Sequence, residues 1–286
     1  MSFLRKMLFG SLFLPAALGQ LVWGQSPTDF TFADVDADGG ATNSPDTTAQ
    51  SGASVDPPAD YAGREVSWKK VIPNLASDQK NIWLFPVRAA KGRYLWPTLA
   101  VIGTTAALIA LDPHDTPYFR KTTAFGDFNS VFSGNNTALG TVIAPAALYV
   151  SGLITKDKKM QTTALLAGEA LANSEIVATV MKDIDRRLRP AAISPNGGNF
   201  TDTWFKDTRY LRSNGSFPSG HTIAAFSVAT VIARRYKNHR WVPYVAYGSA
   251  ALVGFSRVSL QSHYISDVFV GGALGYSIAR FTVLRQ

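Results

Sequence analysis

The sequence predicts an all-α protein whose main domain is a helical bundle of about six core helices. From residue 64 onward, apolar or amphipathic segments alternate with short turn-rich stretches. No sustained alternation of apolar and polar side chains occurs, which argues against a sheet, and we find no internal repeat. The expected helices cover residues 94–111, 138–154, 162–188, 222–236, 241–256 and 266–284.

Residues 1–24 have the composition of a secretory signal peptide. Arg5 and Lys6 form a basic start, and an apolar run that is short for a membrane span follows. Small residues precede Gln20 and Gln25, where a signal peptidase could cut. We therefore expect an exported protein, periplasmic or membrane-associated, with an uncleaved anchor as the alternative.

Residues 25–63 are expected to form a disordered acidic linker. They contain seven Asp and no Lys or Arg, with many Ser, Thr, Gly and Pro. Such a segment cannot bury enough apolar surface to offset its chain entropy. Its DVDADG run (34–39) resembles the start of a calcium loop. However, the twelfth position is Pro45 rather than Glu, and no helices flank the run, which argues against calcium binding.

Residues 64–286 form the expected all-α domain. The chain has no cysteine, which excludes disulfides, zinc–thiolate sites and a thiol nucleophile. Its formal net charge is +8 despite the acidic linker, so the domain is basic. A basic exported domain suggests a phosphorylated small molecule, a phospholipid or a membrane surface as partner, and we expect no nucleic acid. Lys237 and Arg240 are expected to contact anionic lipid; an ordinary soluble basic surface is the alternative.

The sequence alone leaves open whether these helices cross a membrane. Segments 94–111 and 138–154 are uncharged and close to the length of a span. The linkers 155–159 and 234–240 are basic, as inner-facing loops would be. If the leader exports residue 25, however, the loop at 155–159 would lie outside. We therefore expect a domain that is soluble or lies against a membrane, with an integral membrane protein as the alternative.

Two polar clusters border the apolar segments in the middle of the domain. Lys182 and Arg189 are seven residues apart, which would place both on one helix face, with Pro190 ending the helix. The segment GSFPSGHTIAAF places Ser219, Gly220 and His221 at a helix start. Free N–H groups there favour an anion, although helix capping by the serine and solvated charges on a helix face would explain the same residues.

A third cluster, SRVSLQSHYISD, contains Arg257, His263 and Asp267. The histidine and the aspartate are spaced i, i+4, so the carboxylate could orient the imidazole if a helix runs through both. Taken singly, the arginine could cap a helix and the other two could be a surface pair. Taken together, the three clusters supply cations, helix N–H groups and two imidazoles. That set can hold a phosphate dianion without a metal and attack its phosphorus.

The three clusters resemble the signature of the type 2 phosphatidic acid phosphatase (PAP2) superfamily, which also includes bacterial acid phosphatases and vanadium haloperoxidases. The resemblance covers about residues 160–284. It is carried by Lys182, Arg189-Pro190, Pro218-Ser219-Gly220-His221, Ser256-Arg257, His263 and Asp267.

The resemblance implies a metal-independent phosphatase that acts on phosphate monoesters or on lipid phosphates and diphosphates. His263 would form a phosphohistidine, Asp267 would orient it, and His221 would act as general acid and then base. No cofactor is implied. The expected phosphate-binding residues are Lys182, Arg189, Ser219, Gly220 and Arg257.

Other functions use the same residues differently. A vanadate-dependent haloperoxidase would hold vanadate in the phosphate cradle, and an idle module would only bind phosphate or lipid. A serine hydrolase based on Ser219 would have no need of three cations. A metal site formed by His221, His263 and Asp267 is disfavoured because those cations would repel the ion.

Other polar and aromatic residues have simpler interpretations. His114 and His239 lie in turn and loop contexts and are expected to face solvent. Trp204, Phe205 and Phe217 could form an apolar wall for a lipid chain, or could belong to the core.

Overall fold

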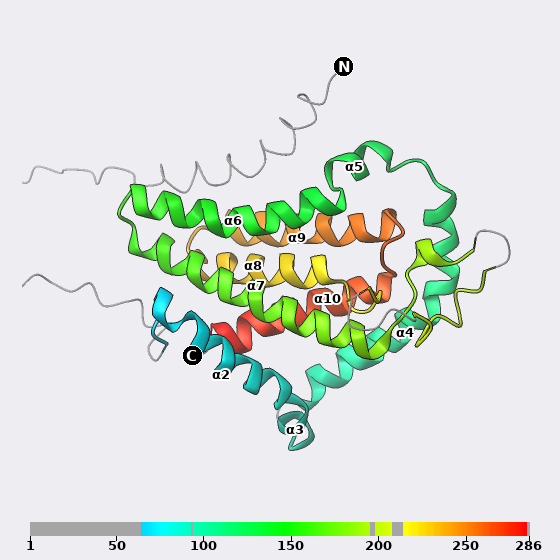
Figure 1. The fold of residues 1–286 in the computed structure, drawn as a ribbon, viewed down its shortest axis with the longest axis horizontal. Coiled ribbons are helices and arrows are strands. Elements are labelled where there is room, and N and C mark those ends of the chain that lie inside the picture. The colour runs from blue at the N-terminus through cyan, green and yellow to red at the C-terminus, as the bar shows by residue number, and fades with distance from the viewer. Residues whose placement is uncertain (1–63, 93, 195–197, 208–213, 285–286) are drawn as a thin grey trace, which may run out of the picture.

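The structure, a computed structural model, describes residues 64–284 apart from 93, 195–197 and 208–213. The expected signal peptide, the acidic linker and its calcium-like run lie outside the described residues. Every regular element in the described part is helical, which confirms the all-α prediction (Figure 1). The elements are η2 Trp68–Lys70, α2 Val71–Trp83, α3 Phe85–Ala90, α4 Leu95–Lys121, α5 Gly126–Val131, α6 Gly134–Ile154, α7 Lys158–Asp185, η3 Pro190–Ala192, α8 Gly220–Arg235, α9 Trp241–Ser259, α10 Ile265–Ile278 and η4 Ala279–Val283.

Helix α8 lies at the centre of the bundle. It packs most extensively against α7, α9 and α10, and α6 covers α7 (Figure 1). Most of its side chains are buried, as expected for a helix that is apolar on every face. The approach of α10 is close because it presents glycine to α8. A side chain at Gly275 would overlap the carbonyl oxygen of Ile223.

The loops divide between the two ends of the bundle. The α6–α7 and α8–α9 loops lie side by side at one end, which we call the basic end (residues 155–159 and 234–240). There Lys159 Nζ lies 4.8 Å from the ring centroid of Tyr236, and Arg235 Nε donates to Thr163 Oγ1 at 2.9 Å. Lys237 and Arg240 are exposed at this end. The other end, where α7 and α9 finish and α8 and α10 begin, carries the residues of the predicted site.

All six predicted helical segments contain a helix, but their limits differ. The turn-rich stretch that follows the predicted helix 94–111 is DPHDTP (112–117). It does not form a turn but continues α4 as far as Lys121, with Pro113 and Pro117 inside the helix. Buried contacts of Asp112 and Thr116 hold this part of α4 against the bundle, and tertiary contacts can override a local signal. Helix α7 ends at Asp185 rather than at residue 188. The sequence did not indicate α2, α3 or α5.

Within the described residues, three stretches are long and apolar enough to cross a membrane by length and composition. They are α4, α6 and Lys158–Ala192, which contains α7. Only 6% of the most apolar window of α4 is buried inside the protein. The exposed faces of α4 and α6 carry large apolar side chains such as Ile102, Leu139 and Val142. Apolar surface of this extent indicates a membrane-associated protein.

Candidate active site

The structure brings the three sequence clusters together at one end of the bundle. They come from the end of α7 with the segment after it, the start of α8, and the junction of α9 and α10. A side chain at Gly220 would place its Cβ 3.1 Å from Lys182 Nζ. A side chain at Gly215 would approach the backbone oxygen of Lys182 to 2.7 Å. Lys182 is thus enclosed by two residues that lack side chains.

Arg189 reaches the site by a route that differs from the prediction. The helix that carries Lys182 ends at Asp185, and Arg186 takes the left-handed conformation with φ 43°. Arg189 has extended backbone angles, so the two cations do not share a helix face. Backbone hydrogen bonds fix this segment: Leu188 N donates to Thr203 O at 2.8 Å, and Ser216 N donates to Arg187 O at 2.7 Å. The charges still converge: burial lowers the pKa of Arg257 and of His263, and the nearby charge of Arg189 lowers both a little further.

The start of α8 differs in one detail from the expected anion site. Ser219 is the N-cap residue by position, but its side chain makes no capping hydrogen bond. Its N–H donates to the carbonyl oxygen of Asp267 at 3.0 Å, so this amide is already engaged. Its Oγ accepts from Thr222 Oγ1 at 2.8 Å, which leaves the serine proton able to donate elsewhere. The hydroxyl of Ser219 and the first-turn amide of Gly220 are therefore the groups suited to a phosphate oxygen.

His221 and Arg257 are both held by the junction between α5 and α6, which the sequence did not connect with the site. His221 Nε2 lies 3.1 Å from the carbonyl oxygen of Gly134, and Arg257 donates to the carbonyl oxygen of Phe132 at 2.5 Å. A carbonyl only accepts, so Nε2 of neutral His221 carries the proton and Nδ1 is its basic nitrogen. Burial lowers the pKa of His221 to about 4, with smaller effects from Arg257 and His263.

His263 lies in the turn before α10, so it does not share a helix with Asp267 as the i, i+4 prediction required. Its Nδ1 is 2.6 Å from the carbonyl oxygen of Ser216 and 3.6 Å from Asp267 Oδ2. The carbonyl again requires an N–H donor, so the proton is on Nδ1 and the lone pair on Nε2. Burial lowers the pKa of His263 to about 4, partly offset by Asp267, so the imidazole is neutral at neutral pH.

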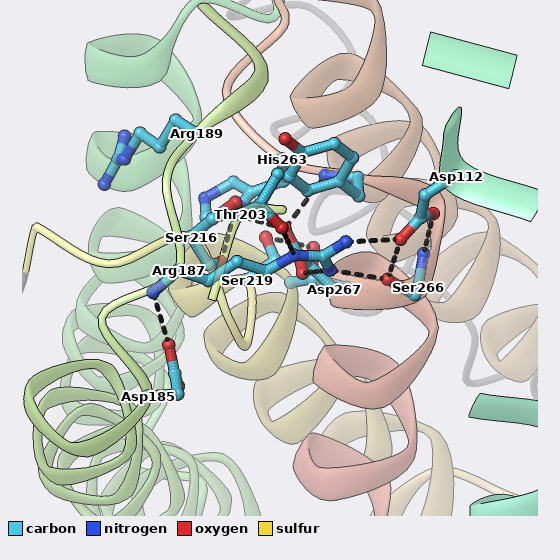
Figure 2. A network of polar contacts seen from close by, with 12 residues as sticks. Asp112, Asp185, Arg187, Arg189, Thr203, Ser216, Ser219, His263, Ser266 and Asp267 are labelled. Carbon is cyan, nitrogen blue, oxygen red and sulfur yellow. Dashed lines mark hydrogen bonds and ion pairs between the residues drawn. The ribbon is translucent and has the colours of Figure 1, made fainter. Parts of the chain in front are cut away.

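Asp267 belongs to a buried polar network that the sequence did not reveal (Figure 2). Its Oδ2 accepts from Ser216 Oγ at 2.5 Å and from Tyr264 N at 2.9 Å. Its Oδ1 accepts from Arg187 NH1 at 2.6 Å, and the same guanidinium pairs with Asp112 at 2.7 Å. Hydrogen bonds and the positive charge of Arg187 hold the pKa of Asp267 below its usual value despite complete burial.

The structure also places the histidines and aromatic residues that the sequence analysis set apart from the site. His114 and His239 are exposed, as expected. Trp204 packs on Phe217 with ring centroids 5.2 Å apart, and both are partly buried. Phe205 is 62% exposed, so the three aromatic residues do not form one wall. The described residues contain no group of three or more His, Asp or Glu side chains placed to hold a metal ion.

Comparison with known proteins decides the family of this region. Residues 163–286 match the family model of the PAP2 superfamily. These residues form a PAP2 domain. The match begins within α7 and includes all eight predicted site residues.

Two curated relatives align with parts of the PAP2 domain and its surroundings. A lipid A 1-phosphatase of Porphyromonas gingivalis is 39% identical over 70 residues, which are 23% of this chain and 16% of that protein. The bacitracin transport permease protein BcrC of Bacillus licheniformis is 30% identical over 128 residues, 45% of this chain and 58% of that protein. The chain therefore spans less than two thirds of either relative.

A solved structure was also compared with the fold. The crystal structure of a transmembrane PAP2 type phosphatidylglycerolphosphate phosphatase from Bacillus subtilis aligns with a TM-score of 0.38 and 21% sequence identity. The alignment covers 72% of this chain and 94% of that one.

Proposed function

We propose that the PAP2 domain is a metal-independent phosphatase that works through a phosphohistidine on His263. The observation that carries this proposal is the short contact between His263 Nδ1 and the Ser216 carbonyl oxygen. The Nδ1–H is held by the Ser216 carbonyl at 2.6 Å, which leaves the Nε2 lone pair for attack on phosphorus. Lys182, Arg189 and Arg257 would bind the phosphoryl oxygens and stabilise the charge of the transition state.

In the first step, His263 Nε2 forms a bond to phosphorus while the bond from phosphorus to the ester oxygen breaks. His221 would donate the proton that the leaving oxygen requires. Its Nε2 already holds the carbonyl of Gly134, so Nδ1 is the nitrogen suited to proton transfer. A neighbouring phosphate dianion raises the pKa of His221 above its low value, because negative charge favours imidazolium.

In the second step, water attacks the phosphorus and the P–N bond breaks, returning the electron pair to His263 Nε2. His221, deprotonated by the first step, would accept the proton of that water. The products are inorganic phosphate and the two histidines in their original protonation states. No oxidant, reductant or metal is required by this balance.

A lipid phosphate is the substrate class we favour. One relative is named a lipid A 1-phosphatase, and the exposed apolar helices suit a protein that meets its substrate in a bilayer. A cluster of phenylalanine rings from α4, α5 and α9 lies beside Arg257, in position to contact an acyl chain. Its members are Phe119, Phe125, Phe128, Phe132 and Phe255, joined by ring contacts of 4.6 to 6.2 Å.

We further propose that α4, α6 and α7 lie in the bilayer, in place of a soluble domain or one that only touches a membrane. Their exposed apolar faces support this proposal. Export by residues 1–24 remains a prediction. Alkaline carbonate washing of membranes from expressing cells tests the assignment: an integral protein stays in the pellet, and release into the wash would contradict it.

The activity test measures inorganic phosphate released by the full chain in detergent and EDTA, from p-nitrophenyl phosphate and from a short-chain phosphatidic acid. We expect release, with the lipid preferred, and loss of release in His263→Ala by several orders of magnitude, because no other group can form the intermediate. The matched control is His239→Ala, which removes an exposed histidine at the basic end. Undiminished release in His263→Ala would contradict the mechanism.

The same assay separates the haloperoxidase alternative. Vanadate binds where phosphate binds, so it should inhibit a phosphatase, whereas a haloperoxidase would require it. Halide oxidation with added vanadate and peroxide, without phosphate release, would favour that alternative.

A further inference from the structure

Arg187 lies at the centre of the buried network and uses every guanidinium nitrogen. NH1 donates to Asp267 Oδ1 at 2.6 Å and to Ser266 Oγ at 2.8 Å, and NH2 donates to Asp112 Oδ2 at 2.7 Å. Nε donates to Thr203 Oγ1 at 3.2 Å. The side chain is 1% exposed, so this geometry admits little freedom (Figure 2).

Two aromatic rings fix the plane of the same guanidinium. Its central carbon lies 3.9 Å from the ring centroid of Tyr264 and 4.5 Å from that of Trp204. Both are close enough for cation–π attraction. A lysine at position 187 would keep the charge but would lose the planar fork that bridges two carboxylates.

Asp112 completes the network from α4, which precedes the matched region at 163–286. Its Oδ2 accepts from Ser266 Oγ at 2.5 Å, and its Oδ1 accepts from Ser266 N at 3.2 Å. Asp112 therefore contacts both Arg187 and the residue next to Asp267. It touches none of the eight residues expected to bind phosphate or to react.

The charge of the network follows from its members. With both carboxylates ionised, the guanidinium and its two partners have a formal net charge of −1, whereas Arg187 with Asp267 alone would be neutral. His263, Lys182 and Asp185 are ionisable groups that face this charge. Arg189 and His221 lie on the far side of His263 and Lys182. When Nε2 bonds to phosphorus, the imidazole keeps its Nδ1 proton and gains positive charge. A net negative network stabilises that charge more than a neutral one would.

We propose that Arg187 and Asp112 are positioning residues for the reaction. They fix the orientation of Asp267 and hold the network at a net charge of −1 when His263 becomes cationic. This inference rests on the proposed phosphatase function.

The test compares Asp112→Asn with Asp78→Asn. Asp78 is also a buried carboxylate that pairs with an arginine, but its partner Arg64 lies away from the site. In the full chain, we expect Asp112→Asn to lower kcat for phosphate release about 100-fold with little change in KM. We also expect the acid limb of its kcat/KM profile to move to lower pH, because an imidazole near less negative charge is harder to protonate. Asp78→Asn should leave kcat and the acid limb unchanged.

A merely structural role for Asp112 would reduce the amount of folded enzyme without moving the acid limb. Arg187→Lys and Ser266→Ala provide further variants, and both should lower kcat more than they raise KM. The proposal fails if Asp112→Asn has the kcat and the acid limb of the wild type while His263→Ala is inactive. It also fails if none of the three variants folds while Asp78→Asn does, since the pair would then be structural. A wild-type chain that releases no phosphate would contradict the phosphatase proposal itself, which is a separate outcome.

Discussion

Two buried networks in the described part of the chain have one arginine that bridges two carboxylates. At the site, Arg187 joins Asp112 and Asp267. Between α2 and α7, Arg64 joins Asp78 at 2.8 Å and Glu169 at 2.5 Å. Both networks have a formal charge of −1 and both connect elements that are distant in sequence.

The two networks differ in the groups, other than arginine, that their carboxylates contact. In the α2–α7 network, Asp78 Oδ2 accepts from Asn173 Nδ2 at 3.0 Å, and Glu169 Oε1 accepts from Asn74 Nδ2 at 2.9 Å. Side-chain amides, which do not titrate, thus complete this network, and the network holds α2 against α7. In the site network, Asp267 Oδ2 faces an imidazole. The same ionic arrangement therefore joins two helices in one place and, in the proposed mechanism, supports a reacting imidazole in the other.

The largest difference in activity between variants of the two networks is expected at Asp267. Asp267→Asn should lower kcat by about 10³- to 10⁴-fold, because an amide no longer provides the charge that orients and stabilises the imidazole. The measurement is phosphate release at saturating substrate, with Asp78→Asn as the carboxylate control in the other network. An Asp267→Asn enzyme within tenfold of wild-type kcat would mean that the carboxylate has no part in catalysis.

The next effect is on stability and concerns the α2–α7 network. Arg64→Met leaves Asp78 and Glu169 buried without their cation, which should lower the free energy of unfolding by about 3–5 kcal/mol. Thermal unfolding in detergent would report this loss, and the kcat of the remaining folded enzyme should not change. A large fall in kcat would show that this network also acts on the site.

The smallest expected effect is a difference between the two networks in how the free energy of unfolding depends on pH. The pKa of His263 is lowered to about 4 in the folded protein from 6.5, so the unfolded chain binds more protons between these values. The free energy of unfolding should therefore fall as pH drops from 6.5 to about 4, by about 3 kcal/mol from this group. The pKa of His221 is lowered by burial to about 4 as well, so His263→Gln should remove about half of that slope, while Asp78→Asn should keep all of it. An unchanged slope in His263→Gln would assign it to other groups.

Much of the site could be predicted because its residues lie in short motifs. The segments around Ser219 and His263 keep their reactive groups within a few residues, so their identity was visible without any knowledge of the fold. The network behind them was not visible. Arg187 stands in the charged run KDIDRRLR, where it resembles a solvated residue, and its partner Asp112 is 75 residues away in a stretch that reads as a turn.

The fold shows the same division between local and distant signals. Helices α8 and α9 begin and end close to their predicted limits because apolar composition marks them locally. Helix α4 runs past its predicted end because Asp112 and Thr116 are buried against the bundle. The end of α7 depends on backbone hydrogen bonds with residues 203–207 and with Ser216, which no pattern near Asp185 reveals.

The glycines beside Lys182 limit which substitutions the site tolerates. An added Cβ at Gly220 would lie 3.1 Å from Lys182 Nζ, and one at Gly215 would lie 2.7 Å from the backbone oxygen of the same lysine. A guanidinium carries the same charge as the lysine ammonium but is wider and planar. Exchange of this lysine for arginine would therefore place a wider group beside Gly220. At this position the size of the cation matters as well as its sign.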